Sequence, residues 1–260
     1  MVLLGGLGWW LGELRLAGVF AAVGAAIVGT ILALGPRALL ASMGARELPL
    51  AQAPLVYSTV ERLALEAGVP KPRLYLLADG YPRSLSVGRG TGDLGIALSR
   101  GLLAMAPPEE LEGILAHELA HARLRDTAVQ TPVVLLALWL VEASRIGGRP
   151  FQRVLLAVLA PLAASLVHVM LSPKRELIAD VFAARLCETP HGLADALARL
   201  EQAMELVEFR GSPVTEPLHL VDPFGNDRLA SLFKTHPRVD DRIGRLRRLD
   251  PDWVDRLEAA

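Results

Sequence analysis

Apolar residues along this chain gather into a few long blocks. The longest block without a charge is 16–35, LAGVFAAVGAAIVGTILALG, which as a helix would be about 30 Å long and match the hydrocarbon core of a bilayer. A shorter apolar stretch, 2–12, precedes it and includes Trp9 and Trp10, a residue type that favours the headgroup layer. We therefore expect residues 1–48 to be an N-terminal membrane anchor, with either one or two transmembrane spans. A cleaved signal peptide is disfavoured because the chain does not open on basic residues.

Two further apolar blocks, 128–141 and 154–171, lie in the middle of the chain. Between them lie Arg145, Arg149 and Arg153. The pattern predicts an inserted hydrophobic helical hairpin over 128–171, and we favour a transmembrane hairpin. A pair of buried helices in a soluble core is the alternative, because the first block is short for a span and the second contains Pro161 and His168. The arginines count against an external location of the loop.

The remaining segments have the periodicity of a mixed helical and stranded domain. Apolar positions at helical spacing predict amphipathic helices at 50–67 and 192–209, and a charged helix is expected at 238–249. Short apolar runs between proline and glycine residues predict strands at 73–77, 85–88 and 94–99. The long connection 210–227, rich in glycine and proline, is expected to be a flexible lid. The predicted fold class is mainly α with a small β-sheet, an α+β catalytic domain, plus transmembrane helices.

Residues 114–125, ILAHELAHARLR, place a His-Glu-x-x-His motif among helix-forming residues. In a helix, His117 and His121 lie one turn apart on the same face, so both imidazoles can bind one ion. Zn²⁺ suits this geometry, because it binds neutral imidazole nitrogen and keeps a position open for water at catalytic sites. Glu118 would act on that water as general base. Two incidental surface histidines are the alternative, since chance gives the motif in roughly one such chain in a hundred.

A zinc protease site needs a third protein ligand, and Glu176 in SPKRELIADVFAARL is the best candidate. Asp180 lies four residues further on, so the two carboxylates share a helix face. One can bind the metal while the other accepts the free N–H of a ligating histidine. Without the upstream motif, this pair would be interpreted as ordinary solvated surface acids.

Three segments, HELAH, SPKRELIAD and LFKTHPRVDDRI, occur in the order typical of one family. The chain from about residue 49 to 249 resembles the HtpX-type membrane zinc metalloproteases, relatives of the CAAX prenyl proteases. The resemblance implies a gluzincin site, in which three residues bind zinc, Glu118 is the base and Asp180 supports a ligand. The implied zinc ligands are His117, His121 and Glu176.

The resemblance also places His236 near the zinc, where it would donate to the developing oxyanion or cover the metal at rest. From the sequence alone, His236 is a loop histidine before a proline. The chain departs from the family pattern at Pro173, where the family usually has arginine, and at 83–88, where the family usually has Asn-Ala-Phe-Ala ahead of a glycine.

In gluzincins generally, an edge strand beside the zinc helix binds substrate as an added strand through main-chain hydrogen bonds. The strand nearest residues 84–88 is our candidate for this role. Its substrate-binding residues would be Ser84, Leu85, Ser86 and Val87. A structural sheet with no substrate role is the alternative.

Composition narrows the possible partners. The chain is 52% apolar with a mean hydropathy of +0.37, above the norm for soluble domains, which favours contact with the lipid bilayer. The net charge of −1 and the lack of a basic stripe exclude nucleic acid as an expected partner. The lone cysteine, Cys187, excludes an intramolecular disulfide and fits a buried residue in a reducing compartment.

The ligand order constrains the domain organisation. Because the motif histidines precede the hairpin and Glu176 follows it, the chain between them crosses the bilayer twice or not at all. Residues 49–127 and 172–260 would together form the zinc metalloprotease domain, with 128–171 inserted.

We predict a membrane-bound zinc endopeptidase that acts on polypeptides. The resemblance implies misfolded membrane proteins as substrates, a role in quality control, and a multi-pass protein of the cytoplasmic (inner) membrane with its active site facing the cytoplasm. The alternatives are a processing protease of narrow specificity and a catalytically silent zinc-containing scaffold.

Overall fold

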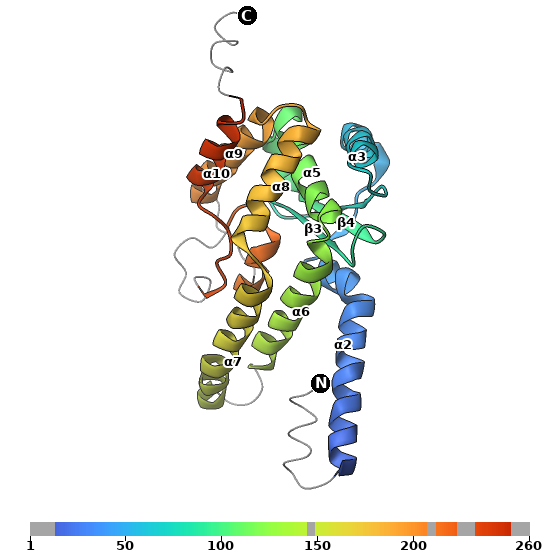
Figure 1. Cartoon of the computed structure of the whole chain (residues 1–260), viewed down its shortest axis with the longest axis vertical. Helices are drawn as coiled ribbons and strands as arrows, with labels where there is room; N and C mark the ends of the chain where they lie inside the picture. The colour runs from blue at the N-terminus through green and yellow to red at the C-terminus, as the bar shows by residue number, and fades with distance from the viewer. Residues whose placement is uncertain (1–13, 145–148, 207–211, 223–231, 251–260) are drawn as a thin grey trace, which may run out of the picture.

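The structure is a computed structural model that describes residues 14–144, 149–206, 212–222 and 232–250. Several helices and a small sheet form a domain at one end, and three long helices extend away from it (Figure 1). The long helices are α2 (Leu14–Ser42), α6 (Thr127–Ala143) and α7 (Arg149–Met170). This mainly helical architecture confirms the predicted fold class. The predicted apolar stretch 2–12, with Trp9 and Trp10, lies outside the described residues.

The sheet has four strands in the order β1-β2-β4-β3. Their bounds are Arg46–Glu47 for β1, Arg73–Leu77 for β2, Ser84–Gly88 for β3 and Leu94–Ser99 for β4. β2 and β4 are parallel, whereas β1 and β3 each pair antiparallel with a neighbour. The three strands predicted from apolar runs are therefore confirmed, and β3 lies at an edge of the sheet.

Helix α5 (Pro108–Arg123) runs through the centre of the domain and contains the His-Glu-x-x-His motif. Pro108 begins it, which is favourable because the first turn needs no N–H donor, and two glutamates follow in that turn. α5 packs against α3 (Pro54–Ala67), α8 (Pro173–Leu186) and α9 (His191–Leu206). α3 ends where predicted, because Gly68 adopts the left-handed conformation with φ of 66°. α10 (Val239–Arg247) covers α8 and α9.

Two glycines permit the closest approach of α5 and α9. A Cβ atom on Gly113 would lie 2.5 Å from the main-chain nitrogen of Leu193. A Cβ atom on Gly192 would lie 2.4 Å from the main-chain oxygen of Glu109. Any larger residue at either glycine would push the two helices apart, so this contact fixes the position of the motif helix in the domain.

α6 and α7 pack against each other and lie between α5 and α8 along the chain. The chain bends by 89° between α5 and α6, and two residues separate the end of α7 from Pro173, which begins α8. Pro150–Met170 is long and apolar enough to cross a bilayer, and only 22% of its apolar window is buried; α5 and α6 together meet the same criteria if counted as one bent span. α2 covers the predicted span 16–35 and is about 43 Å long.

Part of the connection 210–227, which we expected to be a flexible lid, has a defined structure. Residues 213–218 form a short 3-10 helix, η2 (Pro213–Leu218), which packs against α6 and β3. Val214 and Glu216 are both fully buried. Proline restricts the backbone here and apolar side chains join the core, so composition alone gave the wrong expectation for this part of the connection.

Candidate metal centre

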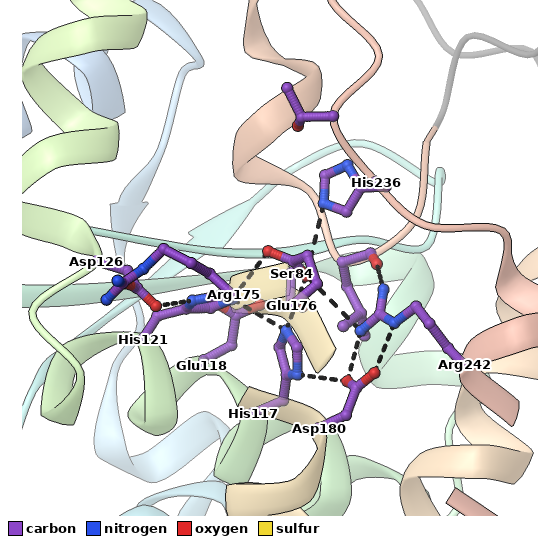
Figure 2. Close-up of polar contacts among 12 residues, drawn as sticks. Ser84, His117, Glu118, His121, Asp126, Arg175, Glu176, Asp180, His236 and Arg242 are labelled. Atoms are coloured by element: carbon purple, nitrogen blue, oxygen red, sulfur yellow. Dashed lines mark hydrogen bonds and ion pairs between the residues drawn. The ribbon is translucent and has the colours of Figure 1, made fainter. Parts of the chain in front are cut away.

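The two motif histidines face each other on one side of α5, as the helical spacing predicted. His117 is 1% exposed and His121 is 6% exposed. Their Nε2 atoms lie 3.0 Å apart. Figure 2 shows both rings turned toward the same point between α5 and α8.

Glu176 reaches this point from the first turn of α8. Ser172 caps that helix by accepting a hydrogen bond from the main chain of Lys174, and Pro173 begins it. The Glu176 carboxylate lies 3.5 Å from Nε2 of His117 and 3.5 Å from Nε2 of His121. These donor atoms all lie within 4.8 Å of one another. The structure therefore brings together the three residues that the sequence analysis proposed as metal ligands.

The chemistry of this donor set fits a metal ion such as zinc. Ligand atoms on a tetrahedral zinc ion are separated by about 3.3 Å, since each bond is about 2.0–2.1 Å long. The separations between the histidine and glutamate atoms, 3.0 and 3.5 Å, are close to this spacing. Oε2 of Glu176 is also buried and has no hydrogen bond. A buried carboxylate oxygen without a donor is costly, and a bound cation would satisfy it.

Each motif histidine has a carboxylate on its other ring nitrogen. Nδ1 of His117 lies 3.0 Å from Asp180, and Nδ1 of His121 lies 3.0 Å from Asp126. A carboxylate that accepts the Nδ1 proton leaves Nε2 free to bind a metal and raises its basicity. Asp180 was expected in this position from the sequence, whereas Asp126 was not.

Two arginines hold these aspartates. Arg242 from α10 donates two hydrogen bonds to Asp180, of 2.8 and 2.7 Å, and a third to the main-chain oxygen of Leu220. Arg175 pairs with Asp126 at the bend between α5 and α6. The segment that has proline at position 173 thus still supplies an arginine, Arg175, which contacts one of the two aspartates.

The charges of the site favour binding of a cation. Burial would lower the pKa of His117, but the Asp180 and Glu176 carboxylates outweigh burial and raise the pKa to about 9. Burial would raise the pKa of Glu176, but the surrounding imidazoles, with His121 foremost, hold this pKa well below its ordinary value. Without a metal, the site thus keeps a proton on His117 beside ionised carboxylates, and a metal ion would displace that proton.

Glu118 lies beside the three predicted metal ligands, and a residue of the β-sheet holds its side chain in place. The hydroxyl of Ser84 in β3 donates a hydrogen bond of 2.6 Å to the Glu118 carboxylate. Both side chains are buried, at 0% and 2% exposure. This bond fixes the carboxylate of the predicted base next to His117, and it joins the motif helix to the edge strand (Figure 2).

The main chain of β3 alternates between its partner strand and the sheet edge. The N–H of Ser99 in β4 bonds to the carbonyl of Arg83, and the N–H of Gly88 donates to Thr131 on α6, outside the sheet. Alternation in an antiparallel pair then directs the main-chain groups of Ser84 and Ser86 away from β4. The other two predicted substrate-binding residues, Leu85 and Val87, have side chains that are 0% exposed. Ser84 and Ser86 are buried as well, at 0% and 3% exposure, so burial does not separate the four residues, and substrate binding by this strand stays a prediction.

His236 lies next to Glu176, beside the three predicted metal ligands. Its Nε2 atom is 3.7 Å from Oε2 of Glu176, is buried and has no hydrogen bond. Its Nδ1 atom lies 2.8 Å from the carboxylate of Glu216 in η2. Among the described residues, the group within 4.8 Å comprises His117, His121 and Glu176, so His236 lies beside the centre and outside that group.

Three residues of the site were missed by the sequence analysis. Asp126 follows His121 by five residues at a helix bend that hydropathy did not reveal. Arg242 belongs to a charged segment that is typical of a solvated helix, although the side chain is only 1% exposed. Glu216 lies in the proline-rich connection. A usable signal existed for Arg242 alone, since it is part of the LFKTHPRVDDRI segment on which the family resemblance partly rests.

Comparison with known proteins supports the same assignment. The family model described as Peptidase family M48 matches residues 50–250. The chain belongs to peptidase family M48. It is 38% identical over 214 residues to a protease HtpX homolog of Pyrococcus abyssi, an alignment covering 76% of this chain and 74% of that protein. It is 36% identical over 261 residues to a protease HtpX homolog of Acidiphilium cryptum, covering 94% of this chain and 90% of that one.

A solved structure shares the fold of this M48 chain. The crystal structure of S. mikatae Ste24p aligns with 94% of the chain, at a TM-score of 0.53 and 17% sequence identity. The alignment spans 63% of the length of that protein. Family and fold together confirm the HtpX-type resemblance, and the chain is a metalloprotease of membranes.

Proposed function

We propose that this metalloprotease is a zinc-dependent endopeptidase. His117, His121 and Glu176 would bind the zinc ion, because two imidazoles and a carboxylate are a common catalytic zinc set. The convergence of these three buried donors within 4.8 Å is the observation on which the proposal depends. A site of three protein ligands also leaves a coordination position for substrate, whereas structural zinc sites are usually closed by a fourth histidine or cysteine.

A zinc ion bound here would supply Lewis-acid chemistry, polarising the scissile carbonyl and lowering the pKa of water. Glu118 would take the proton of the attacking water and later pass it to the leaving amine. Asp180 and Asp126 would keep both histidines in the tautomer with a free Nε2 atom. His236 would lie near the oxygen of the reacting carbonyl, a role supported by its buried Nε2 atom, which is 3.7 Å from Glu176 and has no hydrogen bond.

The substrate would bind as an extended strand along the edge of β3. The outward main-chain groups of Ser84 and Ser86 would pair with the peptide backbone, which gives affinity without dependence on side-chain sequence. Since Ser84 also contacts Glu118, a peptide on this edge would lie beside the base. Broad specificity follows from such recognition.

The proposed substrates are misfolded membrane proteins, and the proposed location is the cytoplasmic membrane, with several spans and the active site on the cytoplasmic side. The proposal for the spans is supported by α2 and by the apolar, largely exposed segment Pro150–Met170. The proposed spans imply a domain division. Residues 1–48 would be the anchor, 128–171 the inserted hairpin, and 49–127 with 172–260 the protease domain.

The test uses the full chain purified in detergent, with casein as substrate. A chelator should abolish cleavage and zinc should restore it. Glu118→Gln should keep its zinc and lose turnover by about 10²–10⁴-fold, the usual contribution of a general base. Glu112→Gln is the matched control, because Glu112 lies on the same helix and pairs with Arg62 at the surface.

Cleavage that survives complete removal of metal would overturn the proposal. Normal turnover by Glu118→Gln would remove this residue from the role of base. Equal loss of activity in the Glu112→Gln control would mean that charge changes in α5 act through folding.

A further inference from the structure

Three histidines around the metal centre share one arrangement. In each ring, Nδ1 lies close to a carboxylate oxygen: at 3.0 Å in His117, at 3.0 Å in His121 and at 2.8 Å in His236. The Nε2 atom of each ring then lies 3.5 to 3.7 Å from Glu176. For the two motif histidines the carboxylates are aspartates. For His236 the carboxylate is Glu216, which comes from the connection between α9 and α10.

Glu216 is built into the protein as a multiple acceptor. Its side chain is 0% exposed, and its carboxylate contacts Thr235 and His236. The N–H of Thr235 donates to both carboxylate oxygens, at 3.1 and 3.2 Å, and the Thr235 hydroxyl donates at 3.0 Å. Glu216 thus fixes the main chain just before His236 as well as the imidazole. A carboxylate is rarely buried without such a set of donors.

The consequence for His236 is a ring that cannot turn freely. With Nδ1 held by Glu216, the opposite nitrogen must face the Glu176 side of the centre, where it is buried and lacks a partner. An unpartnered buried nitrogen is costly, and the reacting carbonyl is the polar group that a peptide would bring to this position. A carbonyl oxygen only accepts hydrogen bonds, so Nε2 can bind it only when this nitrogen also has a proton. Carboxylates on both sides of the ring, Glu216 at Nδ1 and Glu176 near Nε2, favour that doubly protonated form.

We propose that Glu216 is a positioning residue for the protease reaction, acting by holding His236 with Nε2 toward the substrate carbonyl. The inference rests on the proposed function and adds to it a residue outside the metal-binding motifs. The proposal gives Glu216 no contact with the three metal ligands or with the substrate. Its effect on catalysis must therefore pass through His236.

A double-mutant cycle on the full, zinc-loaded chain tests this. Glu216→Ala should lower kcat by about 10–100-fold, as loss of such a supporting carboxylate usually does, and leave KM unchanged. Glu216→Gln should lower kcat less, because the amide oxygen can still accept the Nδ1 proton through a weaker, neutral hydrogen bond. In a His236→Ala background, both changes should have no further effect on kcat.

Glu110→Gln is the matched control. Glu110 is also a buried glutamate, at 6% exposure, but it pairs with Arg199 between α5 and α9. Its effect should be the same in the wild type and in His236→Ala. Equal, additive losses from Glu216→Ala in both backgrounds would overturn the proposal, since they would mean a general structural role. If Glu216→Ala does not fold, the cycle with Glu216→Gln decides by the same criterion.

A second readout needs neither metal nor activity. In metal-free protein labelled with ¹⁵N-histidine, NMR should find a proton on Nδ1 of His236, with the signal assigned by its loss in His236→Ala. In Glu216→Ala, a smaller share of the molecules should have a proton on Nδ1. A bare Nδ1 atom in the wild type would overturn the role of Glu216. Absence of zinc-dependent proteolysis in the wild type would instead overturn the proposed function, so the two failures are distinguishable.

Discussion

Arg242 and Asp180 are joined by two hydrogen bonds, of 2.8 and 2.7 Å, in the buried wall of the metal centre. Arg242 is 1% exposed and Asp180 is 3% exposed. The same aspartate faces Nδ1 of His117 at 3.0 Å. A guanidinium on α10 thereby orients, through one carboxylate on α8, an imidazole on α5.

Replacing Arg242 by alanine should be strongly destabilising. Removal of one partner from a buried ion pair leaves the other charge without compensation, at a cost of about 3–5 kcal/mol. Thermal unfolding in detergent should record a large decrease in Tm, and the metal content should also fall. Arg238→Ala is the control, since this arginine is 81% exposed and its loss should change stability by less than about 0.5 kcal/mol. Equal Tm values for both variants would contradict the role given to Arg242.

Replacing Glu176 by alanine should weaken metal binding, because the proposed site loses one of its three donors. After dialysis against zinc-free buffer, metal analysis should find less than one zinc ion per chain. Glu109→Ala, at an exposed position in the first turn of α5, should keep its metal. Full zinc content in Glu176→Ala would exclude this residue as a ligand.

The stability contributed by Asp180 should depend on pH. Burial would raise its pKa, but the charge and hydrogen bonds of Arg242, helped by His117, hold the pKa below its ordinary value. A carboxyl group with a lowered pKa in the folded state contributes stability above its ordinary pKa of about 3.9, and this contribution is lost as pH falls through the lowered value.

Metal-free wild type should therefore exceed Asp180→Asn in Tm by the same margin from about pH 7 to pH 5, and by a shrinking margin below about pH 4. Thermal unfolding across this range, in one detergent and at constant ionic strength, measures the margin. A difference that does not change with pH would mean that the ionised carboxylate contributes nothing.

The exposed ring of Trp139 on α6 can report on the proposed membrane hairpin. Its side chain is 52% exposed, although it lies in an apolar helix. In a chain with Trp9, Trp10 and Trp253 replaced by phenylalanine, brominated lipids should quench its fluorescence. A single tryptophan introduced instead by Leu65→Trp, at an 83% exposed position on α3, should be quenched little. Equal quenching at both positions would contradict a hairpin that enters the bilayer while α3 stays outside it.

The sequence predicted well those features that depend on neighbouring residues. His117 and His121 needed only helical spacing, and Gly68 ended α3 because glycine adopts a left-handed conformation without strain. Glu176 was predicted because a zinc site needs a third ligand and because its segment resembles a known motif. The strands were predicted because each is a short apolar run between turn residues.

Features that depend on distant contacts could not be predicted in this way. Asp126 acts on His121 because the chain bends by 89° between α5 and α6, and no local pattern specifies that angle. Glu216 is buried because η2 packs against α6 and β3, whereas its proline-rich surroundings indicated a mobile connection. Arg242 lies in a helix rich in charge, and only the packing of α10 on α8 turns it inward.

The hairpin of α6 and α7 separates His121 from Glu176 along the chain, and this has a consequence for biosynthesis. While the ribosome is still making the hairpin, the nascent polypeptide holds two donors of the cluster and lacks the third. Its catalytic machinery is completed only after both hairpin helices have been synthesised and α8 has folded back onto α5. The order of the donors along the chain therefore delays formation of the proposed site until more than half of the chain has been made.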